Sequence, residues 1–452
     1  MRRDSSARIL LALAALSGLC VGALSIVADG PDYRAGSLTK LEAQSIYAAD
    51  PHDAWNRIFY LLFTRTVEVR LTDDFKGVGP YESIDNVMGH PSLTVTSRRF
   101  ERIESGDRAI DPFYPNFFNA AGAESVLADP QFTELKRALT EACAETTLRP
   151  PLQRALMQSD AWAGYDVLSW MRRIHGPTSD RAREILPLLA QFIGKLALSS
   201  EEIAALPDNC AAARKRLNLP DVFNPASGFV EVEWFPQRLH DFTVNNRRAA
   251  RVFLKPETTA DRFLSDTNAR IRKHEDPLPD GLHSLEGAAL TTQMLLIDRK
   301  GRVVPSPLMY ELQFRTSVRE ARGAFKTAAV EEYDLSRKAL LADASSGGLI
   351  RHGDDDPAYL PSSGNDFTFA SPTIGQQEAG PPILATLRRR CESCHFEATV
   401  NTFMMMQDPR RASPPLRQLQ SASNERGLYV AGAKMKESRF NELLGDMRLG
   451  KP

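Results

Sequence analysis

Residues 294–314 read MLLIDRKGRVVPSPLMYELQF. The apolar run Met294–Ile297 leads into the turn residues Asp298–Gly301, and apolar and polar side chains then alternate from Tyr310 to Phe314. A short apolar run and a strict alternation, separated by a glycine-containing turn, are typical of two strands joined by that turn. Pro305 and Pro307 interrupt the second arm, so part of it is expected to be an edge or a loop.

Strand patterns continue on the N-terminal side of this segment. Val230, Val232 and Trp234 alternate with glutamates, and residues 251–255 are a further short strand candidate. On the C-terminal side, the sequence from Ser317 to Leu341 predicts helix. Residues 224–343 are therefore expected to form an α+β domain with a small, mostly antiparallel sheet.

Residues 38–219 predict a mainly helical domain. Asp50, Pro51 and Asp53 supply an N-cap, a proline at the first helical position and an acidic third position. Ser199 and Glu202 have the spacing of a capping box. Apolar residues at helical spacing occur at Trp55, Ile58, Phe59 and Leu62, at Leu152, Leu156, Trp162 and Leu168, and from Leu188 to Leu198.

The length and composition indicate an ordinary globular protein. At roughly 150 residues per domain, 452 residues predict two or three domains. The 56 basic and 57 acidic residues leave a formal net charge of -1, which excludes a polycationic nucleic-acid binder. The 4 Trp, 10 Tyr and 22 Phe are sufficient to build hydrophobic cores, so a disordered chain is excluded as well.

The N-terminal segment 1–28 has the pattern of a secretory signal. Arg2, Arg3 and Arg8 precede an uncharged stretch that ends at Ala28, and cleavage after Ala23 or Ala28 fits its small residues. The alternative is an uncleaved inner-membrane anchor, because this stretch could just span a bilayer. We expect export to the periplasm, with membrane contact only through this segment if it is uncleaved.

Residues 344–382 differ from the rest in composition. They contain Ser345–Gly348, Asp354–Pro357, Pro361–Gly364 and Gly380–Pro382, which are residues of turns and linkers. A domain boundary is predicted here, with a separate C-terminal domain over 383–452.

That C-terminal part contains Cys391-Glu392-Ser393-Cys394-His395, the C-x-x-C-H pattern of covalent haem attachment. Two cysteines three residues apart on a helical turn point their sulfurs the same way, where they can form thioethers with the two vinyl groups of one porphyrin. The adjacent histidine can then bind the iron. With 5 Cys and 8 His in the chain, chance would produce the pattern only about 0.001 times.

Two other readings of the pattern are a zinc site and a thioredoxin-like redox pair. No Cys or His follows His395, so a zinc site would need ligands from distant loops. A redox pair should open a helix after a strand, whereas here a helical pattern leads into the motif. Haem attachment is favoured over both.

The surroundings of the motif resemble a class I cytochrome c. Leu384, Leu387, Cys391 and Cys394 have helical spacing before and through the motif. Phe440, Leu443, Leu444 and Met447 predict a terminal helix. The resemblance covers only 383–452 and implies a small all-α domain with one haem c, attached through Cys391 and Cys394, and His395 as the proximal iron ligand.

The sixth iron ligand is the point of departure from that family, whose members usually supply a methionine before the last helix. Met435 is the best placed, Met404, Met405 and Met406 are further candidates, and Met447 is expected to pack in a core. If none of them binds, the iron is five-coordinate or takes a histidine from the larger region.

The predicted fold is therefore multi-domain: a mainly α N-terminal region, an α+β middle region and a small all-α cytochrome c-like C-terminal domain. The expected function is one-electron transfer to a redox partner protein of unknown identity. The alternatives are a haem oxidoreductase of the peroxidase type with an open iron site, and a haem-containing sensor or binding protein.

Three further residues carry open predictions. Cys143 and Cys210 either form a disulfide in an oxidising compartment or remain two buried thiols. His352 stands beside Asp354–Asp356, where a metal ion or simply a solvated surface is possible, and the solvated surface is favoured.

Overall fold

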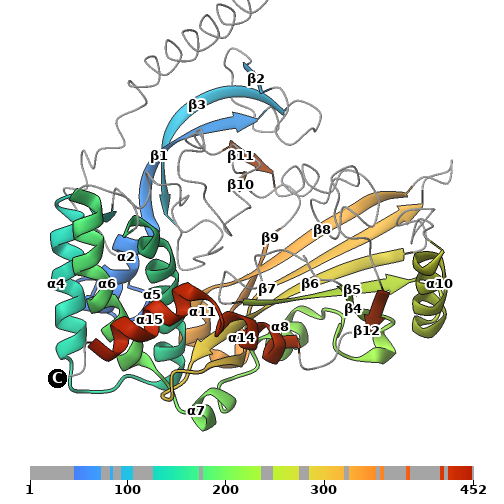
Figure 1. The fold of residues 1–452 in the computed structure, drawn as a ribbon. Helices are drawn as coiled ribbons and strands as arrows, with labels where there is room; N and C mark the ends of the chain where they lie inside the picture. The colour runs from blue at the N-terminus through green and yellow to red at the C-terminus, as the bar shows by residue number, and fades with distance from the viewer. Residues whose placement is uncertain are drawn as a thin grey trace, which may run out of the picture. The chain divides into compact units, whose positions relative to one another are not determined.

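The computed structural model describes twelve stretches of the chain (Figure 1), and the fold is given for these residues. They are 45–72, 82–84, 93–104, 126–172, 177–235, 248–273, 285–319, 325–352, 357–360, 383–386, 418–421 and 426–449. The predicted signal segment 1–28 lies outside them.

Helices dominate the first part of the chain, as predicted. They are α2 (Ala54–Phe63), α4 (Gln131–Ala144), α5 (Pro151–Met171), α6 (Pro177–Leu196), α7 (Ser200–Ala204) and α8 (Asn209–Leu217). Helix α5 packs along α6, and α4 packs against both α2 and α6. The core between them includes the fully buried side chains of Leu135, Trp162, Leu186 and Phe192.

The capping prediction is confirmed at α7, whereas at α2 the N-cap is a different residue from the one predicted. Ser199 and Glu202 form the complete capping box at α7. At α2, Asp50–Asp53 forms a turn instead, and the helix begins at Ala54, where the carboxylate of Asp53 accepts from the Trp55 amide at 2.9 Å. The N-cap is therefore Asp53 and not Asp50.

The first part also contains strands, which the prediction of a mainly helical region did not place. Strands β1 (Thr64–Thr72), β2 (Glu82–Ile84) and β3 (Leu93–Glu104) join two late strands, β10 (Pro357–Leu360) and β11 (Ile383–Thr386). The order in this five-stranded sheet is β10-β11-β1-β3-β2, with β1 and β11 parallel. In β1, Val67, Val69 and Leu71 alternate with charged residues, which is the strand pattern that the helical reading overlooked.

The middle of the chain forms the antiparallel sheet that the sequence predicts. Six strands follow one another, β4 (Val230–Phe235), β5 (Arg248–Pro256), β6 (Leu285–Ile297), β7 (Val303–Arg319), β8 (Phe325–Leu335) and β9 (Leu349–His352). A seventh, β12 (Gln418–Ser421), pairs with the outer side of β4. Helix α10 (Ala260–Arg272) connects β5 to β6 and contacts β12.

The predicted hairpin at 294–314 is confirmed as β6, a turn and β7. The carboxylate of Asp298 accepts hydrogen bonds from the amides of Lys300 and Arg302, both at 2.9 Å, and so closes the turn. Strand β7 continues through Pro305 and Pro307, but β8 pairs with it only from Glu311 onward. The prolines therefore occupy the part of β7 where β8 does not pair, as an edge position requires.

The helix predicted from Ser317 to Leu341 is wrong for most of its length. The chain continues as β7 to Arg319 and forms β8, and only α11 (Arg337–Ala342) is helical. Val330 and Tyr333 are buried in β8, and Tyr333 lies edge-on to Phe314 of β7. Pairing and burial against β7 therefore outweigh the helix-forming composition of this segment.

The predicted linker 344–382 contains sheet strands. Leu349–His352 is β9, and Leu349 is fully buried beside β8. Pro357–Leu360 is β10 of the other sheet. The boundary at 344 is therefore placed too early, because glycine and serine at 345–348 form a turn between α11 and β9 and not a domain junction.

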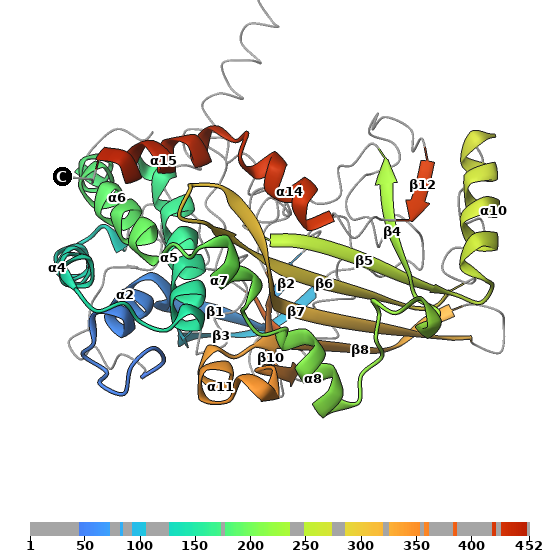
Figure 2. The same cartoon turned by 90° about the horizontal axis from the view of Figure 1, so that it is seen from below.

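The C-terminal segment departs from the predicted helix order. Leu384 lies in strand β11, where helical spacing had suggested a helix leading to the motif. Helix α14 (Arg426–Lys434) packs on β5, β6 and β7, and α15 (Ser438–Leu449) packs along α6 and α5 (Figure 2). The predicted terminal helix exists, with Phe440 and Leu443 buried, and it contacts the first helical region. Among the described residues, no helix is both long enough and apolar enough to cross a bilayer.

Candidate functional site

The residues predicted to hold haem, Cys391, Cys394 and His395, lie outside the described part of the structure. Met404, Met405 and Met406 lie outside it too. All six belong to segment 387–417, which runs from the end of β11 to the start of β12. The structure describes the two strands from which this segment starts and to which it returns.

The two strands that flank segment 387–417 are each hydrogen-bonded into a sheet. Strand β11 pairs with β1 at Ile383 and Leu384, and with β10 on its other side. Strand β12 pairs with β4 from Gln418 to Ser421. One end of the segment is therefore fastened to the five-stranded sheet and the other to the seven-stranded sheet.

Two methionines considered as iron ligands are described. Met435 lies in the turn between α14 and α15, and it is 37% exposed. Met447 packs from α15 onto α6, so closely that a Cβ at Gly194 would lie 3.1 Å from its Cε. Met447 has the packing role expected of it, and the role of Met435 as an iron ligand stays a prediction.

The turn that carries Met435 is fixed by a buried lysine. Lys434 Nζ lies 2.8 Å from Glu437 Oε2 and 3.5 Å from Asp166 Oδ2 on α5, and 5.6 Å from the centre of the Trp162 ring. Burial raises the pKa of the Glu437 carboxyl, and the lysine opposes that rise. These contacts hold the residues around Met435 against α5 while its own side chain reaches solvent.

Helix α15 is attached to α5 by a second polar group. Tyr165 Oη donates to Asp446 Oδ2 at 2.7 Å, and Arg172 Nη2 lies 2.5 Å from the same oxygen. Burial, followed by the hydrogen bond to Asp446, raises the pKa of Tyr165 well above its usual value. Tyr165 is therefore a neutral hydrogen-bond donor at any physiological pH.

Helix α5 also contacts the seven-stranded sheet through buried polar side chains. Gln158 Oε1 accepts from the Ile297 amide at 2.8 Å, and Gln158 Nε2 donates to the Ile297 carbonyl at 2.9 Å. Ser159 bonds Tyr310 of β7 through their hydroxyls. A helix interior that carries so many satisfied polar groups fixes its neighbours in one arrangement.

A buried ion pair completes the surroundings of α5. Arg337 of α11 binds Asp160 through two nitrogens, with Nε 2.8 Å from Oδ2, and both side chains are buried. Tyr47, ahead of α2, donates its hydroxyl to the same carboxylate, and burial raises the pKa of Tyr47. Residues far apart in the chain thus meet on this one helix.

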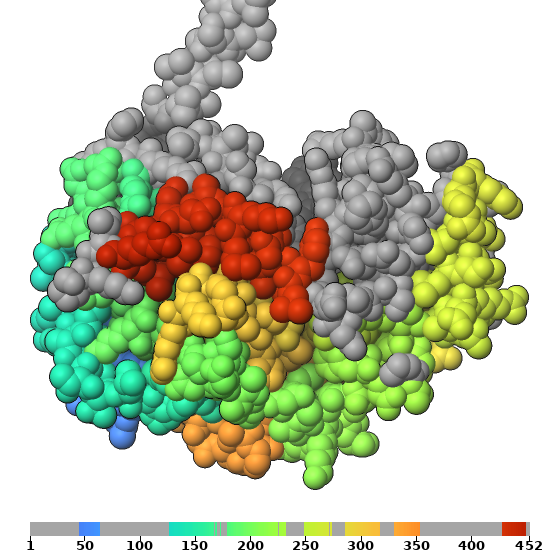
Figure 3. All heavy atoms as spheres, turned by 60° about the horizontal axis from the view of Figure 1, so that its bottom comes forward, coloured from blue at the N-terminus to red at the C-terminus, as the bar shows by residue number. Residues whose placement is uncertain are grey.

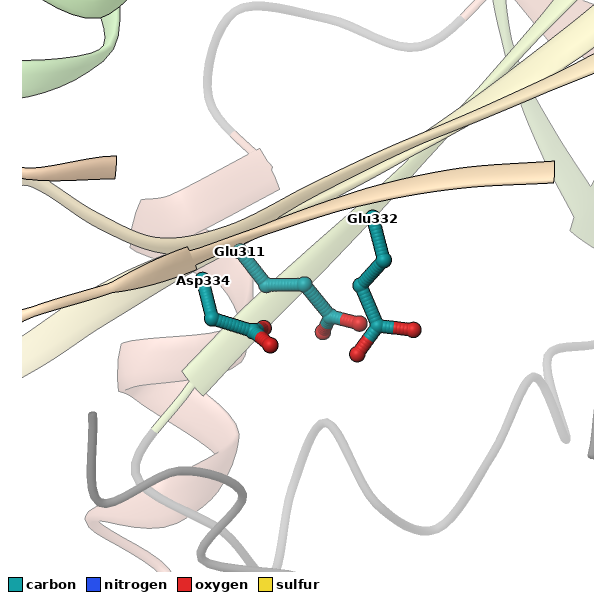
Figure 4. A group of neighbouring side chains, drawn as sticks. All are labelled: Glu311, Glu332 and Asp334. Atoms are coloured by element: carbon teal, nitrogen blue, oxygen red, sulfur yellow. The ribbon is translucent and has the colours of Figure 1, made fainter. Parts of the chain in front are cut away.

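A separate cluster of acidic side chains lies on one face of the seven-stranded sheet (Figure 4). Carboxylate oxygens of Glu311, Glu332 and Asp334 lie within 4.8 Å of one another. Glu311 faces Asp334 across β7 and β8, and Glu332 faces His352 across β8 and β9. His352 Nε2 lies 3.2 Å from Asp334 Oδ2. Carboxylates and imidazole are donors that divalent cations accept.

Neutral side chains also donate to this cluster. Thr292 Oγ1 lies 3.4 Å from Glu311 Oε2, and Gln313 Nε2 donates to Glu311 and lies 3.5 Å from Glu332 Oε2. Hydrogen bonds of this kind lower the cost of burying carboxylates without any metal ion. The cluster therefore has a structural explanation and does not by itself define a cation site.

A local pattern in the sequence indicates part of this acidic cluster. Glu311 and Gln313 alternate with apolar residues in the predicted strand, and Glu332 and Asp334 do the same around Tyr333. Recognising the second alternation would have predicted β8 in place of a helix. The meeting of the two strands depends on their register, which no local pattern fixes.

The structure decides between the two predictions for the cysteines. Cys143 and Cys210 are both free thiols and not a disulfide; Cys210 is buried, and Cys143 is half-buried. Burial raises the pKa of each to about 11. His352 lies beside Asp334, whereas Asp354–Asp356 lie outside the described residues, so the alternatives for His352 and these aspartates stay open.

No family model matches this chain, and no curated protein or solved structure matches it either.

Proposed function

We propose that this chain is an exported c-type cytochrome that carries one covalent haem in segment 387–417 and transfers single electrons in the periplasm. The observation that carries the proposal is the pentapeptide Cys391-Glu392-Ser393-Cys394-His395. Cys391 and Cys394 would form the two thioethers, and His395 would bind the iron from the proximal side. The bound haem would supply the ferrous–ferric couple.

The other cysteines of the chain support this choice of residues. The chain has five cysteines, of which Cys20 lies in the predicted signal segment. Cys143 is half-buried and Cys210 is buried, both have raised pKa values, and such thiols are poor nucleophiles. Cys391 and Cys394 are the pair whose spacing suits attachment to one porphyrin.

The test uses the mature protein produced in cells with a c-type maturation system. A denaturing gel stained for haem and absorption spectra of the oxidised and reduced forms are recorded. We expect a stained band and a sharp reduced α-band, which together indicate covalent, low-spin haem. The double variant C391S/C394S should lose the stained band, and the matched double variant C143S/C210S should keep it.

The remaining outcomes distinguish the alternatives. A stained band with a broad high-spin spectrum would favour an open iron, and hence a peroxidase-type oxidoreductase or a sensor. For Met435, replacement by alanine should abolish the weak far-red band of methionine-bound ferric haem if Met435 is the sixth ligand. A wild-type protein without stained haem would refute the proposal.

A further inference from the structure

Helix α14 presents an apolar face to solvent. Among the described residues, the large hydrophobic side chains that are exposed are Leu148, Leu428, Tyr429 and Met435. Three of these four lie within eight consecutive positions, on α14 and the turn after it. Leu428 and Tyr429 are each 60% exposed. Clustered exposure of this kind marks an interaction surface more often than scattered exposure does.

The face has helical spacing. Leu428, Gly432 and Met435 stand at i, i+4 and i+7, and the Met435 amide continues the helical pattern by donating to the Ala431 carbonyl at 3.1 Å. The other side of the helix packs against the rest of the protein. Val430, Ala431 and Lys434 are buried there, and a Cβ at Gly427 would lie 2.6 Å from Gln293 and 2.9 Å from Pro305.

Gly432 makes the centre of this face flat. Apart from the backbone of α14 itself, no atom of the described residues lies within 4 Å of the position that a Cβ would occupy there. A bare helix backbone flanked by Leu428 and Met435 can receive a planar apolar group at close range. Lys436, which is exposed and follows Met435 in the chain, offers a cation that could pair with a carboxylate of such a group. Figure 3 shows α14 and α15 in red along the surface seen from this side.

We infer that the exposed α14 face, Leu428, Tyr429, Gly432 and Met435, is the docking surface for the haem-bearing segment 387–417 of the same chain. The inference rests on the proposed function, because it assigns a planar, apolar group with carboxylate arms to that segment. A porphyrin is planar, apolar and edged with carboxylates. The face matches these properties with the flat backbone at Gly432, the apolar side chains of Leu428 and Met435, and the cation of Lys436.

Chain connectivity favours this segment over a separate partner. Segment 387–417 ends where β12 begins, and β12 belongs to the sheet that α14 covers. From Ser421 to Arg426 the chain spans at most about 18 Å. A group on the same chain meets the face at a high effective concentration, whereas a separate protein must lose translational freedom to bind there.

The first test is oxidative footprinting of the mature protein, read by mass spectrometry. The wild type is compared with C391S/C394S, which cannot attach haem. We expect Leu428, Tyr429 and Met435 to be oxidised several-fold less in the wild type. Leu148, which is 59% exposed and lies after α4, serves as the internal control and should be oxidised equally in both proteins. If the wild type carries stained haem but its α14 residues are oxidised as much as those of C391S/C394S, the inference is overturned while the proposed function stands.

The second test compares two glycine variants that both keep the attached haem. Gly432 and Gly445 both have open space where a side chain would go, Gly432 on α14 and Gly445 on α15. Both substitutions, G432L and G445L, should therefore leave the fold intact. We expect G432L to change the absorption spectrum and reduction potential of the attached haem and G445L to change neither.

Identical spectra and potentials in the two leucine variants would contradict docking on this face. Absence of haem from the wild type would refute the proposed function, and the inference that rests on it would fall with it. Protection of the face in wild type and C391S/C394S alike would show that something other than haem covers it, which also overturns the inference.

Discussion

Asp160 is a charged side chain that is buried in the protein interior. It is compensated by the bidentate contact with Arg337 and by the hydroxyl of Tyr47. Removing one partner of such a buried pair leaves the other charge uncompensated, which costs about 3–5 kcal/mol. The same charges on the surface would contribute less than about 1 kcal/mol.

We therefore expect Arg337→Met to lower the free energy of unfolding by about 3–5 kcal/mol. The matched control is Arg183→Met, which removes the exposed Asp180–Arg183 pair of α6 and should cost less than about 1 kcal/mol. Urea unfolding of both variants at neutral pH makes the comparison. Equal losses in the two variants would show that the buried pair contributes nothing special.

The thiols of Cys143, which is half-buried, and Cys210, which is buried, make the stability of the protein depend on pH in the alkaline range. Burial raises the pKa of Cys143 and Cys210 to about 11, against 9.0 for an ordinary thiol. The unfolded chain releases these protons first, so the stability that the neutral thiols contribute is complete below pH 9. It is lost as the pH rises from 9 to about 11.

The prediction is that wild type loses more stability between pH 8 and pH 10 than C143A/C210A does. Urea unfolding at the two pH values measures the difference, and the variant corrects for every other group that titrates in this range. Iodoacetamide should also label the native thiols much more slowly at pH 8 than the urea-unfolded chain. A pH response that is the same in both proteins would rule out the contribution of these thiols.

At the scale of single elements, α7 depends on its capping box because it is only five residues long. Ser199 Oγ accepts from the Glu202 amide at 3.1 Å, and Glu202 Oε2 accepts from the Ser199 amide at 2.8 Å. Losing a serine cap costs about 1 kcal/mol. Glu202 also binds Arg154 of α5, so the cap connects α7 to the central helix.

Ser199→Ala is therefore expected to lower the free energy of unfolding by about 1 kcal/mol. Ser265→Ala on the exposed side of α10 should leave it unchanged within about 0.5 kcal/mol. Chemical denaturation resolves a difference of this size. A loss at Ser265 as large as that at Ser199 would attribute the effect to serine in general and not to the cap.

Elements differ in how much of them a local pattern can predict. The hairpin at 294–314, helices α5 and α6 and the cap of α7 follow from residues adjacent in the chain, and all were predicted. Strand β8 was not, because its burial against β7 overrides a composition that favours helix. Strand β11 was not predicted either, and one of its two partners, β1, lies some three hundred residues away in sequence.

The C-x-x-C-H pattern of residues 391–395 can be recognised in the sequence because it needs only five adjacent residues. Contacts between distant residues cannot be recognised in this way, because no local pattern encodes them. The polar contacts of α5 with Tyr47, Tyr310, Lys434 and Asp446 join it to three distant parts of the chain. The acidic cluster of Glu311, Glu332 and Asp334 likewise requires the register of two strands.

At the scale of the whole molecule, the last two helices complete the main core. Phe440 lies 5.8 Å from the Trp162 ring, and Val430, Phe440 and Leu443 are fully buried. Removing these side chains would expose the apolar surfaces of α5, α6 and the sheet against which they pack. Each large side chain lost from a core costs about 2–5 kcal/mol.

A chain that ends at residue 425 is therefore expected to be unfolded or aggregated, while the full chain unfolds cooperatively. Circular dichroism during heating, together with gel filtration, compares the two proteins. A milder variant, Phe440→Ala, should unfold at a lower temperature with the fold preserved, at a cost of about 3–5 kcal/mol. A shortened chain with the stability of the full one would mean that α14 and α15 form an independent unit.

The long-range contacts of α5 have a consequence for the order in which the protein is made. A ribosome releases this helix well before its partners Lys434 and Asp446, since Asp446 follows Tyr165 by 281 residues. Until these partners are synthesised, Trp162 and Tyr165 lack the groups that cover them. Native packing around α5 can therefore be completed only after Asp446 has left the ribosome.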